Sequence, residues 1–182
     1  MTLVSIITQA LVALGMSTDA QTTEAWKDKL AMFANDGMRD LAQYIHIRKE
    51  EDITAVDGRI RLADLSATCV KVLSVKQNGS DVAFTFDPAS YYIHVASDGD
   101  MTVSYEYIPK DMVNDTDVPD LPEALHPLLV PYACFSEHMT RDPNTQRRAN
   151  MFYEKYDDGR RKFRRNMGET DTYNFINTTS GW

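Results

Sequence analysis

The stretch Asp111-Met112-Val113-Asn114-Asp115-Thr116-Asp117-Val118-Pro119-Asp120-Leu121-Pro122-Glu123 decides how this chain divides into structural parts. It is acidic and rich in proline, and the apolar run Ala124-Leu125-His126-Pro127-Leu128-Leu129-Val130-Pro131-Tyr132-Ala133 follows it directly. Aspartate and proline are typical of loops, whereas an apolar run with helical spacing is typical of a buried helix. The stretch therefore separates a β-rich middle from a helical end.

Two helices are predicted ahead of the β-rich middle. Apolar residues from Leu3 to Leu14 recur at helical spacing, and Gly15 supplies a helix stop. Thr22 or Thr23 can cap a second helix whose apolar face runs from Trp26 to Ile45. Gly37 lies on that face, which predicts a close approach by another element. Residues 1–46 are expected to form an N-terminal helix pair.

Between residues 47 and 108 the apolar period changes to two. The alternation is plain at Val82, Phe84 and Phe86 and at Val103, Tyr105 and Tyr107. The pairs Asp57-Gly58, Asn78-Gly79 and Asp98-Gly99 supply the positive φ that tight hairpins need. We expect six short antiparallel strands. They form an inserted subdomain, because the first two helices need the last two to bury their apolar faces.

A second helix pair is predicted after the acidic loop. The buried face of the third helix is expected at Leu125, Leu128, Leu129, Tyr132, Phe135, Ser136 and Met139, and Pro131 predicts either a kink or a start near Pro127. Asp142-Pro143 restarts the chain, and a fourth helix carries Ala149, Phe152, Tyr156 and Phe163 on one face. Residues 109–166 should join residues 1–46 in one body, followed by a tail at 167–182. The predicted fold class is α+β, with a four-helix bundle-like body, an antiparallel β subdomain between helices 2 and 3, and an extended C-terminal tail.

Composition and motifs favour a structural role over an enzymatic one. The 182 residues are 43% hydrophobic, enough for a sizeable core, and Cys69 and Cys134 stand in apolar runs as expected of reduced thiols. Cys134 and His138 have a metal-compatible spacing but lack a second ligand pair, and the acidic loop lacks the glycine of a calcium loop. Helix capping by Asp120 and a favourable charge at Glu123 explain the loop more simply. We expect no catalytic residue, cofactor or metal.

Charge is distributed unevenly along the chain. Residues 145–166 carry +5 within a total of −8, so the remainder carries −13. The basic run consists of Arg160, Arg161, Lys162, Arg164 and Arg165 around Phe163. It can contact nucleic-acid phosphates, or it can pair with an acidic protein partner. The acidic remainder disfavours DNA. The polar tail adds Tyr173, Phe175, Ile176 and Trp182, which we interpret as anchors for a partner rather than as the contacts of a tail folded back on its own domain.

The order of these elements and the stretch Asp117–Glu123 resemble the neck adaptor, or head completion, proteins of tailed bacteriophages. The resemblance implies a structural virion protein that forms a ring of twelve copies on the portal, continues the DNA channel and contacts the next tail or neck component. It implies that genomic DNA passes without specific binding. It implies portal docking by the basic run and the aromatic tail, and a subunit-interface or junction loop containing Asp115, Asp117, Asp120, Glu123 and His126.

Two alternative functions stay open at this point. One is a nucleic-acid-binding module that uses residues 160–165, and the other is a tail-completion or tail-terminator subunit. Because no basic leader and no apolar run of about 18 residues occurs, we expect the chain to be made in the cytosol and to make no membrane contact. The resemblance to phage proteins implies that this cytosol is that of a bacterial host.

Overall fold

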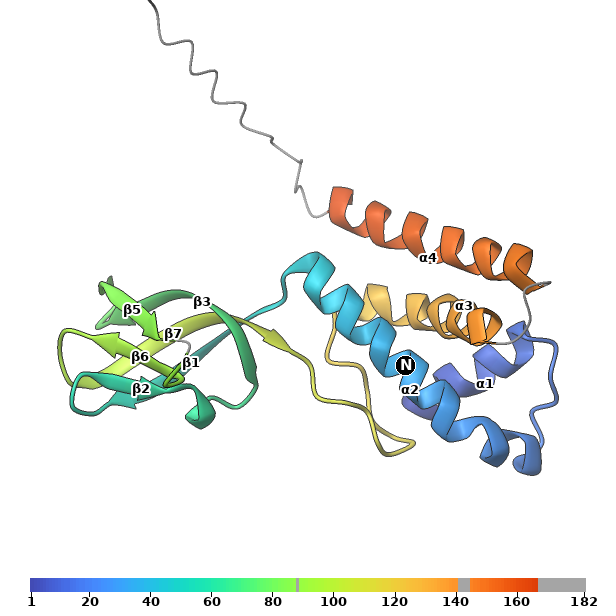
Figure 1. Ribbon diagram of the computed structural model, residues 1–182, viewed down its shortest axis with the longest axis horizontal. Coiled ribbons are helices and arrows are strands. Elements are labelled where there is room, and N and C mark those ends of the chain that lie inside the picture. The colour runs from blue at the N-terminus through green and yellow to red at the C-terminus, as the bar shows by residue number, and fades with distance from the viewer. Residues whose placement is uncertain (88, 141–144, 167–182) are drawn as a thin grey trace, which may run out of the picture.

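Helices and antiparallel strands occupy different ends of the molecule (Figure 1). The computed structural model describes residues 1–87, 89–140 and 145–166. In chain order the strands lie between the second and third α-helices, as the change of apolar period predicts. The α+β class is therefore confirmed.

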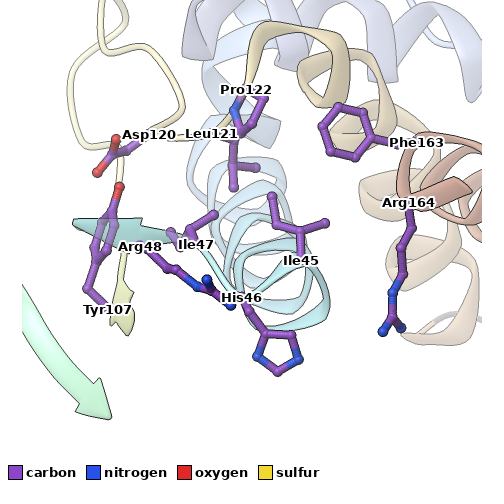
Figure 2. A pocket seen from close by; sticks show the side chains of 10 residues that line it. All are labelled: Ile45, His46, Ile47, Arg48, Tyr107, Asp120, Leu121, Pro122, Phe163 and Arg164. Carbon is purple, nitrogen blue, oxygen red and sulfur yellow. The ribbon is translucent and has the colours of Figure 1, made fainter. Parts of the chain in front are cut away.

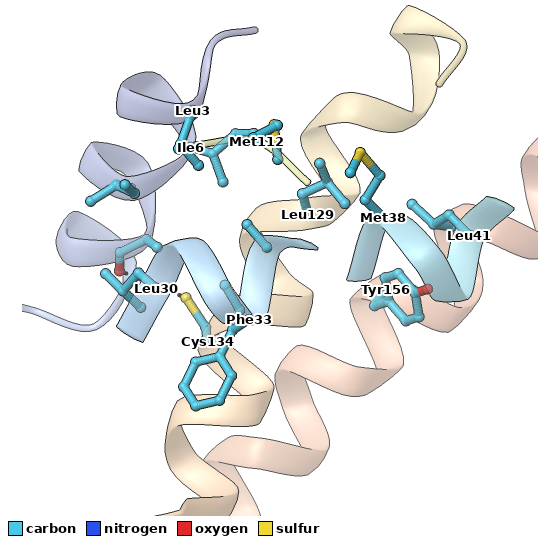
Figure 3. Packing of buried hydrophobic residues seen from close by; sticks show 14 of the residues in the cluster. Leu3, Ile6, Leu30, Phe33, Met38, Leu41, Met112, Leu129, Cys134 and Tyr156 are labelled. Carbon is cyan, nitrogen blue, oxygen red and sulfur yellow. Dashed lines mark hydrogen bonds between the residues drawn. The ribbon is translucent and has the colours of Figure 1, made fainter. Parts of the chain in front are cut away.

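The helical end is built around one hydrophobic cluster. Its helices are α1 (Leu3–Ala13), α2 (Ala20–Ile45), the 3-10 helix η2 (Glu123–Leu128), α3 (Leu129–Thr140) and α4 (Gln146–Asn166). Figure 3 shows the cluster, in which α1 contributes Leu3 and Ile6, α2 contributes Leu30 and Met38, and α4 contributes Tyr156. A single helix of this length is only marginally stable in water, so the burial of apolar side chains in the common cluster is what mainly stabilises these helices.

The ends of α1 and α2 follow local chemistry. Gly15 has a φ of 72° directly after the C-cap residue Leu14, as predicted for the helix stop. The predicted cap at Thr22 or Thr23 is wrong, because Asp19 is the N-cap of α2 and its Oδ1 accepts a hydrogen bond from the Thr22 amide at 2.8 Å. Hydrogen bonds from Ser17 and Thr22 lower the Asp19 pKa to about 2. A carboxylate upstream of a threonine thus starts the helix one turn earlier.

Gly37 allows α3 to pack closely on α2. A Cβ at this position would lie 2.8 Å from Cδ1 of Tyr132, well inside van der Waals contact. Tyr132 in turn packs edge-on against Tyr156 of α4, with ring centroids 4.9 Å apart. The predicted close approach at Gly37 is confirmed, and α3 is the element that makes it.

The strands form two sheets around a second hydrophobic cluster. One sheet has the order β1 (Arg48–Ala55), β7 (Gly99–Ile108), β3 (Thr68–Gln77) and β4 (Ser80–Asp81). The other has the order β2 (Arg59–Arg61), β6 (Tyr92–Val95) and β5 (Phe84–Asp87), and the 3-10 helix η1 (Leu62–Asp64) follows β2. Ile60, Val75, Ile93 and Val103 come from both sheets and meet in this cluster.

Seven strands are described instead of the predicted six. The apolar pattern missed β1, because this strand begins Arg48-Lys49-Glu50-Glu51-Asp52 and is held by its full pairing with β7. Both residues of Asp57-Gly58 and of Asn78-Gly79 have positive φ, as predicted for tight turns. The third pair differs, since only Gly99 has positive φ and the pair connects strands of different sheets. Asp98 instead accepts a hydrogen bond from the Gly58 amide at 2.6 Å.

The predicted buried face of the third helix is partly wrong. Leu125 and Leu129 are buried, but Met139 is 56% exposed and Ser136 is only partly buried. The face that α3 buries also contains Ala133, Cys134, Glu137 and His138. The preceding six residues form the tighter η2, which shifts the helical phase before α3 begins at Leu129. Pro131 then occupies the first turn of α3, where its missing amide hydrogen costs no helical bond.

Candidate interaction surface

The acidic loop at residues 111–123 is anchored to α2. Asn35 is buried on α2, donating from Nδ2 to the Met112 carbonyl at 3.0 Å and accepting from the Met112 amide at 2.9 Å. Lys27 lies 2.7 Å from Asp115, and Arg39 pairs with Asp111. The loop is therefore a fixed part of the helical end. Of its four aspartates, Asp111 and Asp115 have cationic partners on α2.

The same loop also receives the first turn of α1. The Leu3 amide donates to the Asp117 carbonyl at 2.8 Å, and the Val4 amide donates to the Asp115 carbonyl at 3.1 Å. The Asp117 carboxylate accepts from the amides of Val113 and Asn114 at 2.7 and 2.8 Å, which lowers its pKa. Asp117 thus closes the turn from inside the loop, and its carbonyl satisfies an otherwise unpaired helix amide.

Asp120 and Glu123, two further residues of the predicted junction loop, lie near the start of η2. Asp120 does not cap the helix as predicted, because the N-cap of η2 is Pro122, and Asp120 lies beside the Tyr107 hydroxyl. Burial and this carboxylate raise the Tyr107 pKa to about 12. Glu123 is exposed in the first turn of η2, where its charge is favourable as predicted.

His126 is buried and has a partner for each ring nitrogen. Its Nδ1 lies 3.2 Å from the Met1 ammonium, and its Nε2 lies 2.8 Å from the Leu121 carbonyl oxygen. An ammonium can only donate and a carbonyl can only accept, so this geometry suits a ring that accepts at Nδ1 and donates from Nε2. His126 links the chain start to the end of the acidic loop.

Arg160 attaches the basic end of α4 to α2. Its guanidinium donates to Asp40 at 3.0 Å and to Asp157 at 2.9 Å, and only 17% of its side chain is exposed. It also lies 4.6 Å from the ring centroid of Tyr44, and Tyr156 donates a hydrogen bond to Asp40. Burial opposes ionisation, but the bonds to Asp157 and the charge of Asp40 leave the Arg160 pKa raised.

The next basic residues are more exposed and partly neutralised within α4. Arg161 lies 2.8 Å from Asp157 and Lys162 lies 2.5 Å from Asp158, with 67% and 63% of their side chains exposed. Arg164 lies over Tyr44, 5.4 Å from its ring centroid, and Arg165 is exposed. The run is therefore divided into two residues that contact α2 and three that face solvent.

A pocket of about 450 Å³ lies where the helices, the sheet and the acidic loop meet. Figure 2 shows its lining, with Leu121 pointing toward Ile45 and Ile47 and with Phe163 on another side. Phe163 and Arg164 belong to the last turns of α4, Tyr107 to β7, and Asp120 to the loop. The predicted junction loop and the predicted docking helix thus meet at one hollow, which the sequence did not indicate.

Sequence reasoning missed the α2 residues that organise this surface. Lys27, Asn35, Arg39, Asp40 and Tyr44 all belong to α2, and their partners in the acidic loop and in α4 lie 72 to 120 positions away along the chain. The only local signal is that Asp36, Arg39 and Asp40 are charged next to an apolar face. An ordinary solvent-exposed helix face has the same charged residues, so this pattern does not indicate partners.

The thiols and the predicted metal spacing have ordinary surroundings. Cys134 is buried and its Sγ donates to the Ala10 carbonyl at 3.7 Å, while Cys69 is partly buried against the strand cluster. Burial raises the pKa of Cys134 to about 12 and that of Cys69 to about 11. Across residues 1–87, 89–140 and 145–166, no group of three or more possible ligands is placed to hold a metal ion. Among the helices in these ranges, none has the length and apolarity to cross a membrane.

Several predicted residues lie outside the described residues. They are Asp142 and Pro143 at the predicted helix start, and the four predicted anchors Tyr173, Phe175, Ile176 and Trp182.

The sequence profile of the family described as SU10 adaptor protein matches residues 1–179. No curated protein matches the chain.

Proposed function

The chain belongs to the SU10 adaptor protein family, a family of phage head–tail adaptors, and we propose that it forms a ring of twelve copies at the virion neck, between portal and tail. Family membership makes the protein a structural component of a phage virion. The observation that carries the proposal is the extent of the match, which includes the helices, the strands, the acidic loop and the C-terminal segment.

The helical end forms the body of the ring, and the strands at residues 47–108 form a subdomain that projects from it. The two separate hydrophobic clusters support this division. Between them, the anchored loop presents Val113 and Val118, which are 74% and 56% exposed. A fixed loop with exposed apolar tips loses little conformational entropy on binding, which suits a contact between subunits. Asp120 and Glu123 border that contact, while Asp117 and His126 keep the loop in shape.

The C-terminal part of the chain docks on the portal. The solvent-facing charges of Arg161, Lys162 and Arg165 support an electrostatic contact, whereas Arg160 and Arg164 keep α4 against α2. The aromatic residues beyond position 166 supply the apolar anchors, because aromatic side chains dominate the energetics of most interfaces.

The channel side of the ring faces the genome. The chain outside residues 145–166 carries −13, so a surface drawn from it repels phosphate and lets DNA pass without specific binding. The protein has no enzymatic role in this assignment, and the partner on its other side is the next tail or neck component.

Deletion of residues 168–182 tests the docking step. The truncated chain should keep the helical and strand circular dichroism of the full chain but lose binding to purified portal rings. A full-length variant in which Tyr173, Phe175, Ile176 and Trp182 are replaced by serine separates loss of anchors from loss of length. Normal portal binding by both variants would show that the tail is not the anchor.

Nucleic-acid binding by residues 160–165 is the weaker alternative. The solvent-facing charges of this run could contact phosphates as well as a protein, but the chain outside residues 145–166 carries −13 and repels DNA. Salt-sensitive binding of duplex DNA in the absence of portal would favour this alternative. Binding to isolated tail tubes but not to portal would favour a tail-completion subunit.

A further inference from the structure

The pocket beside the end of α4 leaves apolar side chains partly open to solvent. Ile45, Ile47, Leu121 and Phe163 line it, and each is only partly buried (Figure 2). Ile45, Leu121 and Phe163 are at the border of the helical cluster, whereas Tyr107 belongs to the border of the strand cluster. The hollow thus lies along the seam between the two cores, where an apolar occupant would contact both.

The charged rim of the pocket consists of two arginines, Arg48 and Arg164, and one carboxylate, Asp120. His46 also lies there, with its Nδ1 3.2 Å from a Glu106 carboxylate oxygen. An occupant with apolar side chains and a negative charge would therefore fit both the lining and the rim.

Residues 168–182 of this chain have that composition. They contain Tyr173, Phe175, Ile176 and Trp182, carry Glu169 and Asp171, and have no lysine or arginine. Acidic residues come first and apolar residues second, so the segment can pair its charges with the rim and seat its aromatic side chains in the hollow.

The distance along the chain suits a return to the pocket. Helix α4 ends at Asn166, three residues after Phe163 of the lining, and Gly168 is the residue type that reverses a chain beyond a helix end. From Gly168 to Phe175 an extended chain spans about 23 Å. This exceeds the diameter of one helix, about 10 Å, so the segment can cross the end of α4 and enter the hollow.

We propose that in the unassembled protein residues 168–182 fold back onto this pocket, with Phe175 and Ile176 against Ile47, Leu121 and Phe163. The contact is intramolecular, so a linker of this length gives an effective concentration of about 1 mM. A dissociation constant of about 1 mM would therefore keep the pocket half occupied by the segment. The seat does not depend on the proposed function. If the same segment docks on the portal, however, the pocket competes with that partner and the segment must leave it during assembly.

Hydrogen exchange of the full chain and of the chain ending at Met167 tests directly whether residues 168–182 occupy the pocket. Peptides covering residues 45–48 and 120–122 should exchange faster in the shorter chain, whereas peptides from β3 should exchange equally in both. The protection should also be independent of protein concentration. Equal exchange in the two chains would overturn the proposal, and protection that grows with concentration would assign the seat to a second copy instead.

A fluorescein-labelled peptide of residues 168–182 adds a test with matched variants. Its anisotropy should rise on titration with the shorter chain, and Leu121→Ser should weaken the binding by about tenfold, the equivalent of roughly 1.4 kcal/mol. Val113→Ser removes an exposed valine of the same loop outside the pocket and should change the affinity by less than about twofold. Phe163→Ser supplies a second pocket variant from another element. Equal binding to all the folded variants, or no loss when Phe175 and Ile176 of the peptide are replaced by serine, would refute the seat.

Discussion

Replacing Arg160 by alanine should loosen the end of α4 that the proposed docking segment extends. The guanidinium connects Asp40 of α2 with Asp157 of α4 through bonds of 3.0 and 2.9 Å, and it lies over the rings of Tyr44 and Tyr156. With 17% of its side chain exposed, Arg160 is far more shielded than Arg161 and Lys162. The substitution removes all of these contacts together.

The magnitude follows from what those contacts are worth at a partly shielded site. Hydrogen bonds to charged groups contribute about 1.5 to 3 kcal/mol, and a cation over an aromatic ring adds roughly 0.5 to 1 kcal/mol. The contribution of the Arg160–Asp40 pair is smaller than these figures, because 42% of the Asp40 side chain is exposed and solvent screens the pair. Arg160→Ala should therefore lower the free energy of unfolding by about 2 to 3 kcal/mol.

Urea unfolding followed by circular dichroism at the helical signal measures the change. With a slope of about 2 kcal/mol per molar urea, the midpoint should fall by roughly 1 to 1.5 M. Arg161→Ala is the matched control, since Arg161 also pairs with Asp157 but is 67% exposed, and it should cost no more than about 0.5 kcal/mol. Equal losses in the two variants would refute the assignment of Arg160 as the residue that holds α4 on α2.

Three further predictions concern the loop, the helix contact and the pH dependence. Asn35→Ala leaves the buried amide and carbonyl of Met112 without their partner and should lower the free energy of unfolding by about 2 to 4 kcal/mol in urea titrations; a loss below that of an exposed control would contradict the anchoring of the loop. Gly37→Ala places a Cβ against the base of the Tyr132 ring and should destabilise by a net of about 1 to 2 kcal/mol despite its better helix propensity, whereas a gain in stability would contradict the tight packing. The Tyr107 pKa is raised from 10.0 to about 12, so its contribution is complete below pH 10 and is lost as the pH rises through 12. Unfolding measured from pH 9 to 12 should therefore show a shallower decline in Tyr107→Phe, and an unchanged slope would contradict the assignment.

Features that depend on local backbone chemistry could be predicted from the sequence. Gly37 stands on an apolar face and marks a close helix contact, and the Asp-Gly and Asn-Gly pairs specify positive φ whatever surrounds them. The faces of α2 and α4 were also predictable, since apolar residues at helical spacing have to be buried somewhere. In each case the necessary information lies within a few residues.

Features that depend on partners far along the chain could not be predicted. Strand β1 is highly charged and is ordered by its pairing with β7, about 50 positions later. The phase of α3 depends on how many residues before it adopt the tighter 3-10 geometry, which the prolines indicate only roughly. The anchoring of the acidic loop by Asn35 involves two residues 77 positions apart. Periodicity carries no information on such contacts, so the sequence did not show that Asp111, Asp115 and Asp117 have partners within the molecule.

The most direct test of the adaptor assignment is to mix the purified protein with purified portal rings and weigh the products by native mass spectrometry. The protein alone should be monomeric, and it should add to each portal ring as one ring of twelve copies. A protein that stays unbound at concentrations well above those of the portal, while binding DNA in a salt-sensitive manner, would contradict the adaptor assignment.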